Sequence, residues 1–362
     1  MIAGALRPLV VLLLIAWSGA TAAAGQAPAS DTPFAVRYRE LVDAYRGGDT
    51  AAPVGELLAL DGDRLADLVD RYARLWQRGV AAESGIDDAF FRAAAMLHAE
   101  AAVRCWDERL QETGRLQIEL ARRLVDVSQR PGAPPGSFRH RWYAATALLA
   151  ASRVSPPDVI DYFEDAIRKL PGDAALLTAA GWFQERLAEA QAPAGMSLAA
   201  GQTRRRRYQQ DAMRVLRAAL AADPNAAEAA LRLARVEVDR GELTAARQRL
   251  ERLAARDDLQ PLLAYVARLL LAGVEEREGK PGEAERRYRE AIALDPVAQS
   301  ARVALGRLLH AGGDTAGAAA IVEPAVTERD ARSGNDPWGD YRLGYPAIGQ
   351  LVFDALRDEV QR

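Results

Sequence analysis

Three glycines set the strongest constraint on the fold of this chain. Gly241, Gly279 and Gly313 are 38 and 34 residues apart, and each separates two amphipathic stretches of helix length. Asp-Pro pairs end two of these stretches, at Pro224 and Pro296. A unit that recurs at this spacing cannot bury its apolar side alone and must stack against its neighbours. The pattern therefore predicts a solenoid of stacked antiparallel helix pairs.

Composition restricts the fold class and the partners. Alanine, leucine and arginine dominate, β-branched runs are scarce and aromatic residues make up 6% of the chain, so we expect an all-α fold. Lysine and arginine number 47 against 50 acidic residues, a net charge of −3 that lacks the basic excess of nucleic-acid binders, and we expect no nucleic-acid partner. Cys105 is the only cysteine, which excludes an intrachain disulfide, and we expect it to be buried.

The N-terminus has the pattern of an export signal. An apolar run, Leu9 to Trp17, is followed by small residues with A-x-A cleavage sites that end at Ala22 or Ala24. We predict a signal peptide over residues 1–24 and a flexible lead-in over 25–33. The protein is then exported, to the periplasm or the medium. The alternative is an uncleaved N-terminal anchor.

The remaining chain divides into three predicted parts. Residues 34–170 contain helical patterns with short breaks and degenerate repeats. Residues 171–326 contain the clear repeats, interrupted by an insertion over 191–206. Residues 327–362 are expected to form a C-terminal capping helix.

The clearest helical unit runs from Tyr265 to Pro296. It resembles the tetratricopeptide repeat, a helix–turn–helix unit of about 34 residues. The next unit resembles it as well, although Pro324 stands inside its second helix and is expected to kink or end that helix. Stacked helices need small residues where backbones approach and a large residue where a gap must be filled. The resemblance assigns such packing roles to Gly181, Leu233, Gly241, Leu271, Ala284, Tyr288, Ala291, Pro296, Leu305, Gly306, Ala318 and Ala325.

The resemblance also implies a binding groove. In similar proteins the first helices of the repeats line a concave groove that holds an extended peptide. By position, Arg235 and Arg307 would point into this groove with Arg232 beside them, where guanidinium groups can bind carboxylates. The alternative is that these arginines are exposed and only keep the surface soluble.

Four consecutive arginines, Arg204, Arg205, Arg206 and Arg207, end the insertion. We expect them in or just before the first turn of a helix, where positive charge opposes the helix dipole and must be offset. One interpretation is a solvated loop paired with nearby carboxylates. The other is an anion patch that docks an acidic protein segment or a lipid headgroup.

The C-terminus carries a second resemblance. Exported bacterial tetratricopeptide proteins of unknown role end in D-P-W-x-x-Y followed by a helix that ends in A-L-R, and the chain matches at Asp336, Pro337, Trp338, Tyr341, Ala355, Leu356 and Arg357. We expect Trp338 and Tyr341 to belong to a cap that covers the open apolar face of the last repeat. Docking of a partner by these aromatic residues is the alternative.

Motifs for catalysis are missing from the sequence. His98, His140 and His310 lie on three separate predicted helices without ligand-spaced carboxylates, which favours packing or surface roles over metal binding. We expect no enzyme activity, no cofactor and no metal. The leading hypothesis is an exported tetratricopeptide scaffold that binds a protein or peptide in the cell envelope. The alternative is binding of an envelope polymer or a lipid headgroup through the arginine-rich insertion, with peripheral association with the envelope.

Overall fold

A computed structural model describes residues 32–79, 86–128, 134, 136–191, 194–327 and 336–362. All regular structure in these ranges is helical. The helices are α1 Pro33–Arg46, α2 Ala51–Ala59, α3 Gly62–Gln77, α4 Asp88–Asp107, α5 Gln111–Ser128, α6 Phe138–Ala150, α7 Pro156–Lys169, α8 Ala174–Glu189, α9 Leu198–Ala222, α10 Ala227–Arg240, α11 Leu243–Ala254, α12 Pro261–Arg277, α13 Pro281–Leu294, α14 Gln299–Ala311, α15 Thr315–Thr327, α16 Pro337–Leu343 and α17 Tyr345–Val360. The predicted signal peptide lies outside the described residues.

Local sequence fixes many of the helix ends. The side chains of Asp61, Asp87 and Asp173 each accept a hydrogen bond from a backbone N–H in the first turn of the following helix. Gly241 follows α10 with a φ of 80°, in the left-handed region that favours glycine. The chain can therefore reverse direction there and begin α11.

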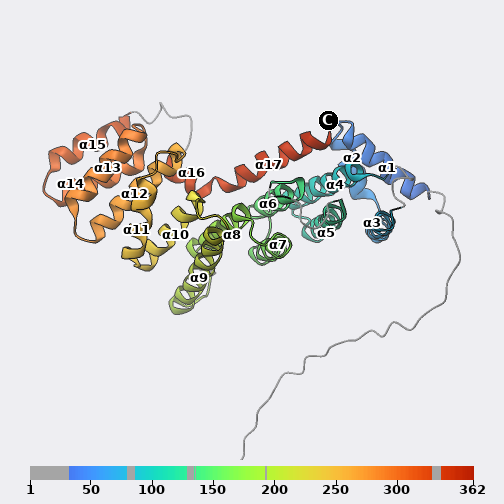
Figure 1. Cartoon of the computed structure of the whole chain (residues 1–362), viewed down its shortest axis with the longest axis horizontal. Helices are drawn as coiled ribbons and strands as arrows, with labels where there is room; N and C mark the ends of the chain where they lie inside the picture. Colours follow the sequence, from blue (N-terminus) through green and yellow to red (C-terminus); the bar gives the residue numbers. More distant parts are fainter. Residues whose placement is uncertain (1–31, 80–85, 129–133, 135, 192–193, 328–335) are drawn as a thin grey trace, which may run out of the picture.

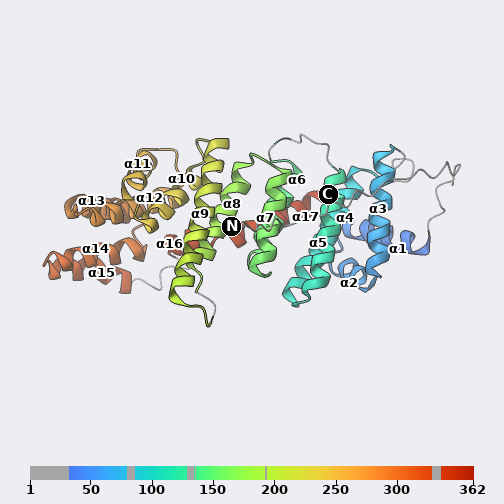
Figure 2. The ribbon, with the colours of Figure 1, turned by 90° about the horizontal axis from the view of Figure 1, so that it is seen from below.

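Consecutive helices pack as antiparallel pairs, and the pairs stack into one elongated superhelix (Figure 1; Figure 2). The pairs are α4 with α5, α8 with α9, α10 with α11, α12 with α13 and α14 with α15. The prediction of an all-α solenoid is confirmed. Across the described residues, no helix is both long enough and apolar enough to cross a bilayer.

The C-terminal segment, defined as residues 336–362, does not lie where we predicted. Instead of covering the last repeat, α17 runs back along the superhelix and packs on α6 and α4, so the C-terminus lies near α1 and α2 (Figure 1). Gly349 permits this course because a Cβ at that position would stand 2.7 Å from the Leu148 Cβ. The exposed face of α17 carries Leu351, which is 69% exposed. A cap over α15 by this helix is therefore excluded by its packing against the other end of the molecule.

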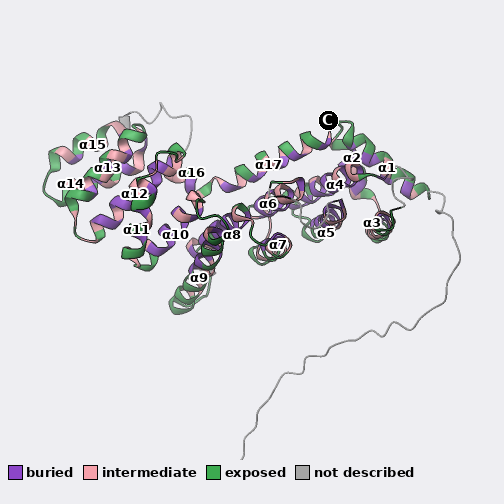
Figure 3. Ribbon diagram, in the orientation of Figure 1, coloured by how far each residue is buried: buried purple, intermediate pink, exposed green. Residues whose placement is uncertain are grey.

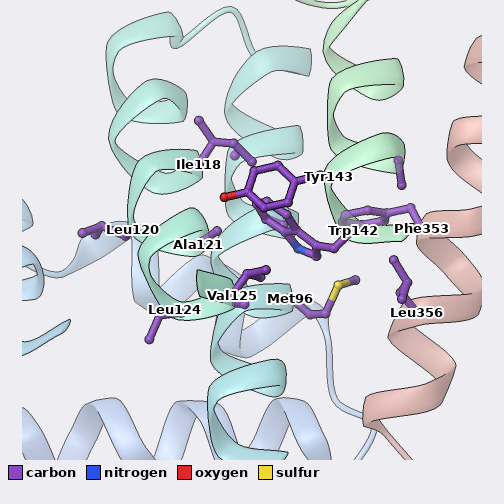
Figure 4. Close-up of a cluster of buried hydrophobic side chains, with 14 of the residues drawn as sticks. Met96, Ile118, Leu120, Ala121, Leu124, Val125, Trp142, Tyr143, Phe353 and Leu356 are labelled. Atoms are coloured by element: carbon purple, nitrogen blue, oxygen red, sulfur yellow. The ribbon is translucent and has the colours of Figure 1, made fainter. Parts of the chain in front are cut away.

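The largest core lies in the N-terminal half and includes α17. Phe353 and Leu356 of α17 are buried together with Met96 of α4 and Trp142 of α6 (Figure 4). The buried residues form a continuous stripe along the inner helices, whereas the outer faces are exposed (Figure 3). The C-terminal segment is therefore part of the fold of helices that precede it by about 200 residues.

The residues assigned to packing occupy close contacts between helices. Gly181 lies against Leu216 of α9, and Gly306 lies against Val322 of α15, where an added Cβ would stand within 2.5 Å of these side chains. Tyr288 is buried with the inner residues of α12 and α14. Also buried are Leu233, Leu271, Ala284, Ala291, Leu305, Ala318 and Ala325, whereas Pro296 is exposed after the end of α13.

Two sequence expectations need correction at the helix level. Helix α15 does not end at Pro324 but continues to Thr327. Helix α9 begins at Leu198, so much of the predicted insertion is an N-terminal extension of this helix. The four arginines consequently lie beyond the first turn, where the helix dipole no longer penalises them strongly.

Candidate functional site: the concave face

The C-terminal segment lies lengthwise on the inner helices. At one end, the Asp336 carboxylate accepts hydrogen bonds from the backbone N–H groups of Gln299 and Ser300 at the start of α14, at 2.6 and 3.0 Å. At the other end, the Gln361 side chain donates to the backbone oxygen of Tyr45 in α1, at 3.0 Å. One segment thus crosses the concave face from the last repeat to the first helix.

Arg232 of α10 holds the middle of this contact. Its side chain is 0% exposed, with the guanidinium carbon 4.4 Å from the Tyr341 ring centre and 4.7 Å from that of Tyr345. It donates to the backbone oxygen of Tyr341 at 3.0 Å and pairs with Glu228 at 2.9 Å and Glu185 at 3.3 Å. Burial lowers the pKa of Arg232, but the neighbouring tyrosines and glutamates raise it more, so it stays charged.

Arg235 lies one turn further along α10. Its guanidinium pairs with Glu185 at 3.1 Å and with Glu189, and it stands 5.3 Å from the Trp338 ring centre. Glu189 also pairs with Arg342 of the C-terminal segment at 2.8 Å. Burial raises the pKa of Glu185, and its two arginine partners oppose that shift.

These contacts correct the predicted groove. Arg232 and Arg235 do face the concave side, as their positions in the repeats imply, but their charges are matched by this chain's own glutamates and covered by its own aromatic residues. A peptide partner cannot reach Arg232 without displacing the C-terminal segment. Arg307 lies outside this cover, 64% exposed, and pairs with Glu276 at 2.7 Å.

A large hollow remains on one side of α17. It has a volume of about 840 Å³ and is lined by the N-terminal turns of α6, α8, α10 and α12 and by the flank of α17. Small side chains such as Ala144, Ala175 and Ala227 leave the space open, and Ile348 and Val352 of α17 form an apolar wall. Charged residues stand at the rim, among them the pair of Arg256 with Asp258 at 2.8 Å, and the His140 Nδ1 lies 2.9 Å from an oxygen of the Asp173 carboxylate.

A smaller hollow of about 440 Å³ lies at the C-terminal turns of the same inner helices. We call it the basic hollow because Arg205, Arg235 and Arg342 line it, together with Trp338 and the carboxylates Glu189 and Asp239. The C-terminal segment therefore divides the concave face into an apolar side and a basic side. Sequence reasoning placed Arg205 and Arg235 in two separate candidate sites, and the structure brings them to one.

The other members of the arginine run point elsewhere. Arg204 donates to the backbone oxygens of Ala190 and Gln191, at 2.7 and 3.2 Å, just past the C-terminal end of α8. This contact places positive charge at the negative end of a helix dipole. Arg206 and Arg207 are exposed and make no hydrogen bond or ion pair with any described residue.

The histidines are found in packing or surface positions. His98 is buried, 3.0 Å from the Tyr38 hydroxyl and 2.5 Å from the Gln117 amide oxygen, and burial lowers its pKa to about 4. His310 is exposed at the end of α14. Among the residues that the structure describes, no group of three or more histidine, cysteine or acidic side chains could hold a metal ion.

Two family models, both described as tetratricopeptide repeat, match residues 210–270 and 269–336. Residues 210–336 are therefore tetratricopeptide repeats, which correspond to the pairs from α10 to α15 and the second half of α9. The helices before residue 210 lie outside both matches. Fold and sequence together define an all-α superhelix of stacked helix pairs that contains tetratricopeptide repeats.

Several solved structures are similar to part of the chain. MamA of Desulfovibrio magneticus RS-1 is 18% identical over 56% of this chain and 100% of that chain, with a TM-score of 0.43. PilF of Pseudomonas aeruginosa is 15% identical over 62% and 90%, with a TM-score of 0.43. TTC0263 of Thermus thermophilus is 20% identical over 59% and 99%, with a TM-score of 0.37. A comparison with curated proteins gave no match.

Proposed function

We propose that this protein is an exported, non-catalytic scaffold that binds a segment of another protein in the cell envelope. The observation that carries this proposal is the large hollow, an apolar trough of about 840 Å³ on the concave face of a tetratricopeptide superhelix. The export signal predicted over residues 1–24 supports the compartment. Repeats of this kind bind protein or peptide partners in general.

The shape of the large hollow favours an apolar segment of a partner. Its floor consists of alanine side chains from successive helices, and its wall includes Ile348, which is 46% exposed. Partner side chains that cover this wall would remove apolar surface from water, which is the main favourable term in association. The charged pairs at the rim would then set the orientation of the segment.

Site-specific crosslinking tests the proposal. Ala175 is exposed within the large hollow, and a photoreactive p-benzoylphenylalanine at this position should capture a reproducible protein partner in the producing cells. Ala293, exposed on the outer helix α13, provides the matched control. Ala175→Arg should then weaken binding of the purified partner roughly tenfold or more, because the long charged side chain fills the apolar trough. Equal capture from both positions would contradict the proposal.

A second candidate function rests on the free end of α9. Leu198 is 79% exposed there, on the same helix as Arg206 and Arg207, which make no ion pair with any described residue. An exposed leucine and free arginines on one helix are typical of surfaces that contact anionic lipid headgroups. Sedimentation with phosphatidylglycerol vesicles tests this function, which predicts binding that is lost in Arg206→Glu/Arg207→Glu.

A further inference from the structure

The two halves of the superhelix have separate hydrophobic cores, and the C-terminal segment is divided between them. Four buried side chains of α17 belong to the core of the N-terminal half. Tyr341 of α16 belongs to the core of the repeats, and Trp338 packs against that core. The division falls at Gly344, the single residue between α16 and α17. The helical course of the segment is therefore interrupted where it passes from one core to the other.

Charged side chains fill the concave side of the joint between the halves, where α8 meets α10. Glu185 and Glu189 of α8 pair with Arg232 and Arg235 of α10, and Glu189 also pairs with Arg342 of α16. Among the described residues, the Glu185 Oε1 and the Arg342 Nε are buried without a hydrogen-bond partner. A Coulomb attraction falls slowly with distance, whereas an apolar contact loses up to about half of its energy over a gap of about 1 Å. This side of the joint can therefore change its spacing at lower cost than a close-packed core.

The outer side of the joint is apolar and narrow. Ala212, Leu216 and Ala219 of α9 form a small core with Ala229 and Leu233 of α10, separate from the two larger cores. Alanines on both helices let the backbones approach closely. This contact can consequently serve as an axis about which the two halves rotate.

The large hollow lies across the same joint. Its lining comes from α6, α8 and α17 on one side and from α10 and α12 on the other. A rotation that brings the concave ends of the two halves together would narrow the hollow. An occupant would then contact both halves at once, as ligands do in proteins that close around them.

From this arrangement, we infer that the joint between α8 and α10 is a hinge, that the two halves close over the occupant of the large hollow, and that the C-terminal segment bends at Gly344 during closure. Closure on a protein segment rests on the proposed function, whereas the hinge does not. An occupant that contacts both halves stabilises the closed arrangement over the open one, because it gains contacts only there.

Double electron–electron resonance on the full-length protein tests the hinge. Spin labels at Asp161→Cys in α7 and Ala293→Cys in α13 report across the joint, and both positions are exposed. Labels at Asp67→Cys in α3 and Asp161→Cys lie within the N-terminal half and give the matched control. The distance distribution across the joint should be roughly twofold wider than the control distribution, because the halves adopt more than one angle. Cys105 is buried and should take no label.

A second pair of labels controls for the repeats. Ala245→Cys in α11 and Ala319→Cys in α15 are exposed on one side of the joint. Their distribution should be as narrow as that of the N-terminal control. A distribution across the joint no wider than the two controls would overturn the hinge, and so would equal widening of all three.

An apolar probe, anilinonaphthalene sulfonate, tests closure. Its fluorescence reports binding, and the bound probe should narrow the distribution across the joint to about the control width, because it selects one arrangement. Ala175→Arg fills the hollow and should abolish the narrowing, whereas Ala218→Arg, at an exposed position of α9 outside the hollow, should keep it. Three results would overturn closure: no binding, binding without narrowing, and narrowing that persists in Ala175→Arg.

The outcomes also separate this inference from the proposed function. If the probe narrows the distribution but Ala175 captures no partner, the hinge stands and the scaffold function fails. If Ala175 captures a partner while the distribution across the joint is as narrow as the controls, the scaffold function stands and this inference is wrong.

Discussion

The two halves of the superhelix achieve burial by different means. In the repeats after residue 226, small cores of alanine and leucine with Tyr265 or Tyr288 lie mainly between sequence neighbours, and Tyr341 and Trp338 of α16 pack on one of them. In the N-terminal half, one large aromatic core is completed by Tyr345, Phe353, Leu356 and Val360, which come from the far end of the chain. The repeats therefore pack mainly on adjacent pairs, whereas the core of the N-terminal half is completed by α17.

This difference explains why the family models match only the second half. A repeat that packs on its sequence neighbours needs the same small and large residues at the same positions each time. Helices that pack on α17 do not need the same residues at repeated positions, since α17 is not part of a repeat. The C-terminal segment consequently covers the middle of the concave face, and two of the hollows lie along its flanks.

The largest expected effect comes from removing residues 345–362, which contain α17, while α16 stays in place. Four buried apolar side chains of α17 would be lost, and at about 1.5–3 kcal/mol each their removal costs roughly 6 kcal/mol or more. Hydrogen exchange should show loss of protection in α4 and α6 and retained protection in α12 and α13. Leu351→Ala, at an exposed position of α17, should leave protection unchanged. Uniform loss of protection along the chain would mean that the two halves depend on α17 to the same extent.

Arg232→Met tests the joint between the halves. Glu185 would stay buried with Arg235 as its one remaining partner, so the loss should be about 3 kcal/mol, the lower end of the cost of breaking a buried ion pair. Urea unfolding followed by circular dichroism gives the loss. The double variant Arg232→Met/Glu185→Gln should recover part of it, because the charge that lost its partner is gone. If the double variant recovers none of the lost stability, the whole loss comes from the packing of Arg232 against Tyr341 and Tyr345.

Tyr288→Ala tests the repeat half alone. The ring fills the gap between α12, α13 and α14, so its loss should cost about 3 to 5 kcal/mol of unfolding free energy. Tyr288→Phe removes only the hydrogen bond to Glu276 and should cost about 1 kcal/mol. Protection in α4 and α6 should not change. A spread of the loss into those helices would contradict the independence of the two cores.

The smallest effect is a pH dependence from the N-terminal core. The pKa of His98 is about 4 in the folded chain and about 6.5 in the unfolded chain, so only the unfolded state gains the proton between these values. Stability should therefore fall by about 3 kcal/mol as the pH drops from about 6.5 to about 4. His98→Gln should remove this contribution. Urea unfolding of the parent and of His98→Gln at the two pH values gives the change in unfolding free energy of each protein. An equal change in both proteins would contradict the prediction.

The sequence predicted the fold class well because a helical repeat is determined by sequence patterns within one unit. Gly241, Gly306 and Tyr288 each act within one repeat unit and its neighbour: Gly241 in a turn, and Gly306 and Tyr288 in the packing between helices. The candidate site was predicted only in part. Arg232 and Arg235 were predicted to line an open groove, and nothing in their local sequence shows that Tyr341 and Trp338 cover them. The aromatic spacing of the D-P-W-x-x-Y element was the available signal, and it was assigned to the wrong surface.

By itself, the sequence determined that the chain is an all-α solenoid with tetratricopeptide repeats in its second half, since these features depend on periodicity and on neighbours a few residues away. Only the tertiary structure decided where the C-terminal segment lies. That choice rests on complementarity between surfaces about 200 residues apart: a close approach at Gly349, a buried arginine between two tyrosine rings, and an aromatic core left open until α17 fills it. The same choice left the two hollows open on either side.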